Sequence, residues 1–320
     1  MNQIAIDVRD FAIPIPRKGS IEPGSGYGLS IASAMGVAVH KKIQQAKKEV
    51  DPNYRAEVKI SHSFSVDKYC VQISGRIDGI FESIKNPECD PTPQTKIEEI
   101  KTAFSTTHLC KTLEADPEHP YLLQVKTYAY LYWKRTGVLP NCAILIASLL
   151  DRNDVRLIDI PFDLAVFEQW FQRRVIALIS ELQFQKKEHK RRLRLAKILQ
   201  FPFECARPGQ QQLIDQIGRI LADSKQILVQ APTGLGKTMA ILYPALRDSL
   251  ERGQRLVYCT PKNSLHLVAE NAVDKLREQN QRIKSLTLTA KSKLCMMPEP
   301  ICDPTICQYA RDHYSKMSEN

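Results

Sequence analysis

The 320-residue sequence has no apolar run long enough to cross a membrane, and no export signal follows Met1. It also has no internal repeat and no low-complexity segment. These absences argue against a membrane protein, an exported protein and a repeat protein. They predict a cytoplasmic protein with no membrane partner.

Because an export signal is absent, the nine cysteines are expected to be thiols or metal ligands rather than a disulfide framework. The length predicts two domains, and a hydrophobic content of 43% is enough for each to bury a core. The net charge of +10 favours a polyanionic partner such as nucleic acid.

The most specific short motif is Ala231–Thr238, which reads APTGLGKT. A predicted strand, Gln226–Gln230, precedes it and a predicted helix begins at Met239. The next strand and loop are predicted over Arg255–Lys262, and this order of elements predicts the beginning of a parallel α/β sheet. The motif has the pattern of a phosphate-binding loop, with Ala in place of the usual first Gly. Its glycines let backbone N–H groups surround a phosphate. Lys237 is expected to reach the β and γ phosphates of a nucleotide, and Thr238 to hold Mg²⁺.

A second candidate site lies in the N-terminal half, on a predicted strand over Lys96–Thr102. The two-residue period of a strand places Glu99 and Lys101 on one face. Asp78 ends a hairpin predicted over Tyr69–Ser83, and a neighbouring strand can bring it beside Glu99. Two carboxylates and a lysine together predict a Mg²⁺ or Mn²⁺ site that can activate water against a phosphodiester.

Other predicted elements surround this site. Residues 1–28 are rich in proline and glycine and show no periodicity that predicts an element. A loop is predicted over Lys85–Thr95. The remaining predictions are a helix from Leu29, a strand over Ala56–Phe64, a helix after Pro117, strands over Asn141–Leu150 and Val155–Ile160, and an amphipathic helix over Asp163–Phe184.

Four motifs follow one another over roughly residues 30–180: Gly-x-x-x-His, Gly-Arg-Ile-Asp, Glu-x-Lys and Gln-x-x-x-Tyr. Together they resemble the RecB-like branch of the PD-(D/E)xK nucleases, which includes CRISPR-associated RecB-like exonucleases. The resemblance implies a restriction-endonuclease-like fold, a metal taken from solution and a DNA substrate, often an end. It also implies roles for individual residues: His40, Asp78 and Glu99 as metal ligands, Lys101 as catalytic, and Gln124 and Tyr128 as residues that contact DNA or brace the site.

Each of these motifs also has an ordinary structural interpretation. His40 alone is typical of a helix surface or a core. Glu99 and Lys101 alone are typical of a solvated pair on a strand, and Asp78 beside Gly79 of a turn. Some relatives carry an iron–sulfur cluster with three late cysteines, but no such trio follows Tyr128. No cluster is therefore predicted in the nuclease half.

Between the two halves, residues 186–200 read as a basic linker, in which Lys186–Lys197 contains seven cations and one acid, Glu188. A solvated helix or linker explains this composition, and so does a stripe that contacts phosphates.

Three cysteines, Cys295, Cys302 and Cys307, lie near the end of the sequence. Their spacing predicts a soft-metal or iron–sulfur site, and a zinc site with His313 as fourth ligand is the alternative. Three unrelated thiols are the structural explanation.

The order Arg-x-x-Gln, phosphate-binding loop and Cys-rich segment resembles the start of XPD/DinG-type superfamily 2 DNA helicases and covers residues 201–320. It implies that Cys295, Cys302 and Cys307 bind a 4Fe–4S cluster, and that Thr260 and Lys262 touch DNA. It also implies a nucleotide site made by Gln210, Thr233, Gly234, Gly236, Lys237 and Thr238. A fourth cysteine, an Asp-Glu-x-His motif and a second motor lobe are missing. We therefore expect a fragment of a longer polypeptide, with any fourth cluster ligand outside it.

The sequence thus predicts an α/β protein in which a nuclease domain (1–185) and a basic linker (186–200) precede a truncated, RecA-like helicase domain (201–320). The Cys-rich segment spans 291–320. The predicted function is metal-dependent cleavage of DNA strands or ends, coupled to an ATP-dependent helicase for repair or end processing. Two alternatives stay open: a DNA-dependent ATPase whose N-terminal domain only binds DNA, and a non-catalytic DNA-binding module.

Overall fold

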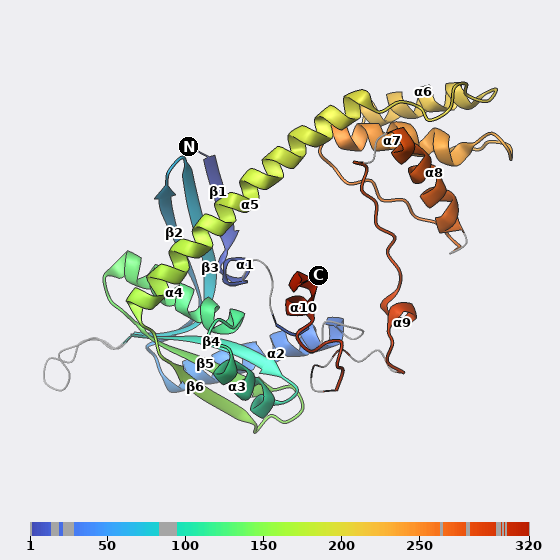
Figure 1. The fold of residues 1–320 in the computed structure, drawn as a ribbon. Coiled ribbons are helices and arrows are strands. Elements are labelled where there is room, and N and C mark those ends of the chain that lie inside the picture. The colour runs from blue at the N-terminus through green and yellow to red at the C-terminus, as the bar shows by residue number, and fades with distance from the viewer. Residues whose placement is uncertain are drawn as a thin grey trace, which may run out of the picture. The chain divides into compact units, whose positions relative to one another are not determined.

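The computed structural model describes residues 2–13, 19–21, 29–82, 95–262, 265–279, 282–298, 302, 304 and 306–319. The chain divides into two compact units. The first comprises Met1–Ile179 together with Cys295–Asn320, and the second comprises Ser180–Leu294. Helix α5 (Leu164–Ile198) contributes its N-terminal part to the first unit and its C-terminal part to the second (Figure 1).

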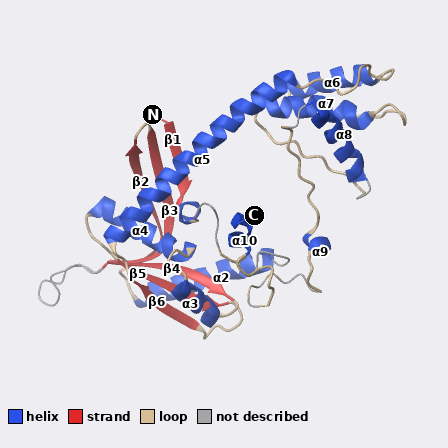
Figure 2. Ribbon diagram, in the orientation of Figure 1, coloured by secondary structure: helices blue, strands red, loops and turns tan. Residues whose placement is uncertain are grey.

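A six-stranded mixed sheet forms the centre of the first unit (Figure 2). The strands run in the order β1-β3-β4-β5-β6, and β2 pairs along β3. The β1–β3 and β4–β5 pairs are parallel and the other pairs are antiparallel. This sheet confirms the α/β class. Its strands are β1 (Asn2–Asp7), β2 (Tyr54–Val66), β3 (Tyr69–Glu82), β4 (Thr95–Ala103), β5 (Asn141–Ser148) and β6 (Val155–Ile160).

Helices cover both faces of the sheet around β4. On one face, Ile100 packs in a cluster with Val39 and Ile43 of α2 (Leu29–Val50). Since successive strand residues point to opposite faces, Glu99 and Lys101 face the other side. There α4 (Pro120–Thr136) contacts the sheet. Covering on both faces explains why β5 is apolar from Cys142 to Ala147 and buried from its second residue to its last.

The N-terminal segment contains elements that the sequence did not predict. Residues 2–7 form β1, and Val8–Ala12 form the short helix α1, whose cap is Asp7. Phe11 of α1 is fully buried against Trp170 and Phe171 of α5. β1 forms by pairing with a strand more than sixty residues away. The pattern of the local sequence therefore gives little indication that residues 2–7 form a strand.

The predicted hairpin over 69–83 is wrong, because residues 69–82 form the single long strand β3. The turn instead joins β2 to β3 at Asp67 and Lys68, where Asp67 has a φ of 49°. The glycines that suggested a turn permit close packing. A Cβ atom at Gly75 would lie 2.8 Å from Cε1 of Tyr128, and one at Gly79 would collide with the ring of Tyr54. Most of the predicted loop over 85–95 lies outside the described residues.

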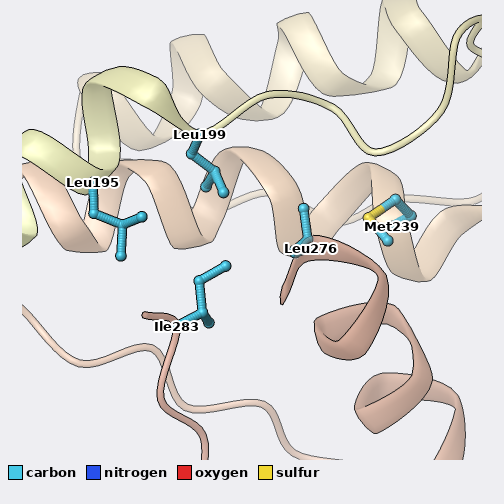
Figure 3. Packing of buried hydrophobic residues seen from close by; sticks show 5 residues of the cluster. All are labelled: Leu195, Leu199, Met239, Leu276 and Ile283. Atoms are coloured by element: carbon cyan, nitrogen blue, oxygen red, sulfur yellow. The ribbon is translucent and has the colours of Figure 1, made fainter. Parts of the chain in front are cut away.

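The second unit consists of packed helices: the C-terminal part of α5, α6 (Gln210–Ala222), α7 (Lys237–Glu251) and α8 (His266–Gln279). The helix predicted to end near Phe184 continues to Ile198, so the basic residues 186–197 are helical. Figure 3 shows one buried cluster of this unit, formed by Leu195, Leu199, Met239, Leu276 and Ile283.

The strands predicted over 226–230 and 255–262 are not strands in the structure. In the described part of the second unit, no segment is assigned as a strand, so neither has a pairing partner. Leu228 is fully exposed and Val257 is 77% exposed, as expected for apolar strand-like segments without a sheet. The parallel sheet predicted for this half is therefore not formed by the described residues.

Three further helices belong to the described chain: α3 (Thr106–Ala115), α9 (Lys291–Leu294) and α10 (His313–Glu319). α10 is linked to the N-terminal region, because the backbone N–H of Tyr314 donates to the carbonyl oxygen of Gly19 at 2.9 Å. Within the described residues, no helix is both long and apolar enough to cross a membrane.

Candidate active site

The candidate site lies where β3 and β4 separate. Their ladder covers Gly79–Glu82 of β3 and Thr95–Glu98 of β4 and then ends. Just beyond the ladder, the side chain of Asp78 replaces the backbone of β3 as the hydrogen-bond acceptor. Its Oδ2 accepts a hydrogen bond of 2.8 Å from the backbone N–H of Ile100. The side chain thus satisfies a backbone donor left unpaired by the diverging strands. This bond fixes Asp78 beside β4.

Glu99 and Lys101 form a buried ion pair on the face of β4 toward α4. Nζ of Lys101 lies 2.8 Å from Oε1 of Glu99 and 2.9 Å from Oε1 of Gln124, and 4.4 Å from the centre of the Tyr121 ring. Glu99 is only 3% exposed. Its second oxygen, Oε2, is buried and accepts no hydrogen bond within the described structure. A carboxylate oxygen in this position needs a cation or a proton.

His40 reaches the site from α2. Its Nδ1 lies 3.9 Å from Oδ2 of Asp78. Gly36, one turn earlier, lets the helix approach the sheet, because a Cβ atom there would lie 3.0 Å from Oγ1 of Thr102. Gln44, one turn later, donates a 2.9 Å hydrogen bond to the carbonyl oxygen of Asp78. The predicted Gly-x-x-x-His spacing therefore serves both packing and the site.

Tyr128 and Gln124 brace this arrangement from α4. Gln124 holds the Lys101 ammonium, as described above, and is hydrogen-bonded to Tyr128. The Tyr128 hydroxyl also accepts a 3.3 Å hydrogen bond from the backbone N–H of Arg76 on β3. Burial, together with the nearby Glu99 carboxylate, raises the pKa of Tyr128. The hydroxyl consequently stays protonated at physiological pH.

The pKa values of the acidic groups are strongly perturbed. Burial raises the pKa of Glu99 from 4.5 to about 7, although Lys101 opposes the shift. Burial likewise raises the pKa of Asp78 from 3.8 to about 6, against the hydrogen bond from Ile100. The pKa of His40 is lowered by burial and by the Lys101 charge. Two carboxyl groups held at such pKa values, beside a neutral imidazole, favour the binding of a cation.

Glu57 is a site neighbour that the sequence reasoning missed. It lies on β2 between Ala56 and Val58, which pair with Gly79 and Ile77, so it is opposite Asp78. Its φ of 58° is rare for a residue with a side chain. Its carboxylate accepts hydrogen bonds from Gln44 at 2.9 Å and from Arg76 at 3.1 Å. Only the strand register reveals this neighbour, since an outward Glu on a strand is ordinary in sequence.

The residues present fit a hard divalent cation. Among the described residues, no three His, Cys, Asp or Glu side chains already form a complete metal-binding group. Even so, carboxylate oxygens and an imidazole are suitable donors for Mg²⁺ or Mn²⁺. The orphaned Oε2 of Glu99 is the observation that most directly calls for one. His40, Asp78 and Glu99 are the residues that would hold it.

The phosphate-binding loop of the second unit has the local geometry that its sequence predicts. Gly234 and Gly236 have φ values of 84° and 79°, and α7 begins directly after Gly236. The Lys237 ammonium folds back onto the carbonyl oxygens of Ala231 and Pro232, at 2.9 and 2.8 Å. The loop thus presents its glycines and its lysine at a helix N-terminus, where anions bind favourably.

Gln210 is buried next to this loop. Its Nε2 donates to the carbonyl oxygen of Gly236 at 3.1 Å, and its Oε1 accepts from the backbone N–H of Arg207 at 3.0 Å. Arg207 in turn donates to the carbonyl oxygen of Gly234. The predicted nucleotide-binding residues therefore meet in one place, with Thr233 exposed in the loop and Thr238 half-buried in the first turn of α7.

The three late cysteines do not form a recognisable site in the described structure. Cys295 and Cys302 are half-buried and Cys307 is buried, all as free thiols. Within the part of the chain that is described, they belong to no metal-binding group of three. The cluster and its ligands stay a prediction.

A comparison with known protein families finds a match in the C-terminal part of the chain. A family model for DEAD/DEAH box helicases matches residues 207–299, which include Gln210 and the phosphate-binding loop. The match covers less than half of the chain and shows that residues 207–299 are similar to that family. The XPD/DinG subtype stays a prediction. A comparison with curated protein sequences finds no match.

Two solved structures have a distant likeness to the chain. The crystal structure of SSO0001 is 16% identical, with 55% of this chain and 77% of that chain covered and a TM-score of 0.36. An alkaline exonuclease, LHK-Exo from Laribacter hongkongensis, is 14% identical, with 58% and 94% covered and a TM-score of 0.33. Likeness at these TM-scores is too weak to assign an activity, so the assignment of the first unit depends on its site.

Proposed function

We propose that the chain is a metal-dependent DNA nuclease joined to the N-terminal part of an ATP-dependent DNA helicase. It acts on single strands or DNA ends in repair or end processing. The observation that carries the nuclease is the convergence of Asp78, Glu99 and Lys101 at the fork between β3 and β4. An orphaned Glu99 oxygen marks that point. The helicase assignment is supported by the DEAD/DEAH box match and by the loop geometry.

The residues of the fork have separable tasks in phosphodiester hydrolysis. A bound Mg²⁺ or Mn²⁺ supplies polarisation of the phosphate and a lowered pKa for water. Asp78, Glu99 and His40 hold that ion. Lys101, fixed between Glu99 and Gln124, keeps a positive charge next to the reacting phosphate and orients the attacking water. Gln124 and Tyr128 limit the movement of this lysine.

In the second unit, Lys237 binds the β and γ phosphates of ATP and Thr238 binds its Mg²⁺. Gln210 fixes the loop and contacts adenine. Thr233, Gly234 and Gly236 provide the backbone around the phosphates. A 4Fe–4S cluster on Cys295, Cys302 and Cys307, with zinc as the alternative, is a further part of this proposal. A brown colour of the purified protein would favour the cluster.

The proposal is tested by incubating the full chain with end-labelled single-stranded DNA and Mn²⁺. We expect shortened products, and none after the metal is chelated. An intact oligonucleotide at every Mn²⁺ concentration, with DNA binding retained, contradicts the nuclease assignment. ATP turnover under those same conditions would favour the ATPase alternative. Binding without either activity would favour the non-catalytic one.

The nucleotide site gives a separate prediction. Lys237→Ala removes the ammonium that neutralises phosphate charge, and hydrogen bonds to charged groups are worth roughly 1.5–3 kcal/mol. We therefore expect ATP affinity to fall about 10–100-fold. Binding of a fluorescent ATP analogue measures it. Lys225→Ala is the matched control, because Lys225 pairs with Asp223 on the exposed surface outside the loop. Equal affinity for both variants would show that the loop does not bind nucleotide.

A further inference from the structure

A polar groove of about 530 Å³ is lined by residues of β1, β2, β3 and α4 and lies outside the candidate active site. Three cations line it: Lys59 of β2, Arg76 of β3 and Arg135 of α4. One carboxylate, that of Asp7, is opposed to them. Asp7 is already engaged as the cap of α1, accepting a 2.8 Å hydrogen bond from the backbone N–H of Arg9. The groove therefore carries excess positive charge.

Two of the three cations of this groove are available to a ligand, whereas Arg76 is paired with Glu57 at 3.1 Å. Among the described residues, neither Lys59 nor Arg135 has a carboxylate within ion-pair distance. The guanidinium carbon of Arg135 lies 5.9 Å from the centre of the Tyr132 ring, which holds it without neutralising it. Ser61, Ser74 and Gln72 add uncharged hydrogen-bonding groups to the lining. Cations interspersed with hydroxyl and amide groups are the typical lining of a surface that contacts a sugar–phosphate backbone.

The groove lies close to the fork of the sheet along β3. Arg76 lines the groove, and Asp78 lies two residues further along the same face of β3, which corresponds to about 6.7 Å. Glu57 connects the groove to the fork, because its carboxylate accepts hydrogen bonds from Arg76 and from Gln44. Gln44 also donates a hydrogen bond to the carbonyl oxygen of Asp78. Gly75, also in the lining, contacts Tyr128. A nucleic-acid strand bound in the groove would therefore pass close to the candidate metal ligands.

We propose that this groove binds the sugar–phosphate backbone of one DNA strand next to the phosphate that is cleaved. Lys59 and Arg135 contact phosphates there, and Arg76 contacts the phosphate nearest the fork. The proposal rests on the nuclease function proposed above. It adds the path of the substrate, over the β2–β3 hairpin and the end of α4.

The test measures how salt weakens DNA binding. Each phosphate contact made by a single strand contributes about −0.7 to the slope of log K against log salt. The full chain carrying Glu99→Gln, in a metal-free buffer, binds a labelled oligonucleotide without cleaving it. Adding Lys59→Gln and Arg135→Gln is expected to make the slope less steep by about 1.4. Thermal melting verifies that the added substitutions leave the fold intact.

Lys48→Gln with Arg152→Gln is the matched control, because both residues are exposed cations of the first unit outside the groove. This pair is expected to leave the slope unchanged. An equal slope for the groove pair and the unmodified background contradicts the proposed path. Cleavage by the wild-type chain is scored separately. If the wild-type chain cleaves DNA but the groove substitutions leave the salt slope unchanged, only the proposed DNA path is contradicted. If those substitutions reduce the slope but the wild-type chain never cleaves DNA, only the nuclease assignment is contradicted.

Discussion

Replacing Glu99 with glutamine is expected to lower the rate of DNA cleavage by at least about 10³-fold. The substitution keeps the shape of the side chain but removes the negative charge that a cation needs. Glu99 is 3% exposed, and one of its oxygens has no hydrogen-bond partner within the described structure. Its charge is therefore not explained by packing alone. Release of labelled nucleotides, measured at saturating Mn²⁺, gives the rate.

Glu98 supplies a matched control on the same strand. It is as buried as Glu99 but points to the opposite face, where its carboxylate pairs with Lys47 of α2. Glu98→Gln should cost stability, on the order of 1–3 kcal/mol, because it leaves Lys47 without its partner. It should nevertheless keep cleavage within a few-fold of wild type. Similar losses of cleavage in both variants would mean that Glu99 acts only through the fold.

The second large effect concerns stability against pH in the metal-free protein. The folded-state pKa values of Glu99 and Asp78, about 7 and about 6, lie above the ordinary values of 4.5 and 3.8. Folding therefore favours the protonated forms. This contribution is fully present below about pH 4 and is lost as the pH rises through about 7. One pKa unit corresponds to about 1.4 kcal/mol, so the loss is on the order of 3 kcal/mol for each of the two groups.

Mn²⁺ should reverse this loss, because it replaces the proton as the partner of the buried carboxylates. We expect thermal melting between pH 5 and 8 to show falling stability without metal, and a Mn²⁺-dependent gain that grows with pH. Glu99→Gln should melt at a higher temperature than wild type in metal-free buffer at pH 8, and should gain little from Mn²⁺. A pH profile unaffected by this substitution would contradict the burial argument.

Much of the candidate site was predictable from sequence because it depends on local spacing. The strand period places Glu99 and Lys101 on one face, and the structure pairs them at 2.8 Å. The helical period places Gln124 and Tyr128 together, and the structure hydrogen-bonds them. The phosphate-binding loop was equally predictable, since its glycines require the positive φ values that they adopt.

Other features depend on contacts between distant segments, and the sequence predictions failed or were silent there. β1 was missed because its pairing partner lies far along the chain. The hairpin was placed wrongly because Gly75 and Gly79 were interpreted as turn residues, although they make room for tyrosine rings. The strands expected around the phosphate-binding loop are absent from the described second unit, where no neighbouring strand satisfies their backbone.

The sequence by itself determined which side chains share a face or a turn, because periods of two and of 3.6 residues are properties of the local backbone. That was enough to name Asp78, Glu99 and Lys101 as a candidate group, and the resemblance to RecB-like nucleases added His40. Only the tertiary structure decided that β3 and β4 diverge at Asp78, that Glu57 lies opposite it, and that Arg76 of the same strand lines a groove with two further cations. These features arise from strand register and burial, which are set by contacts between residues far apart in the chain.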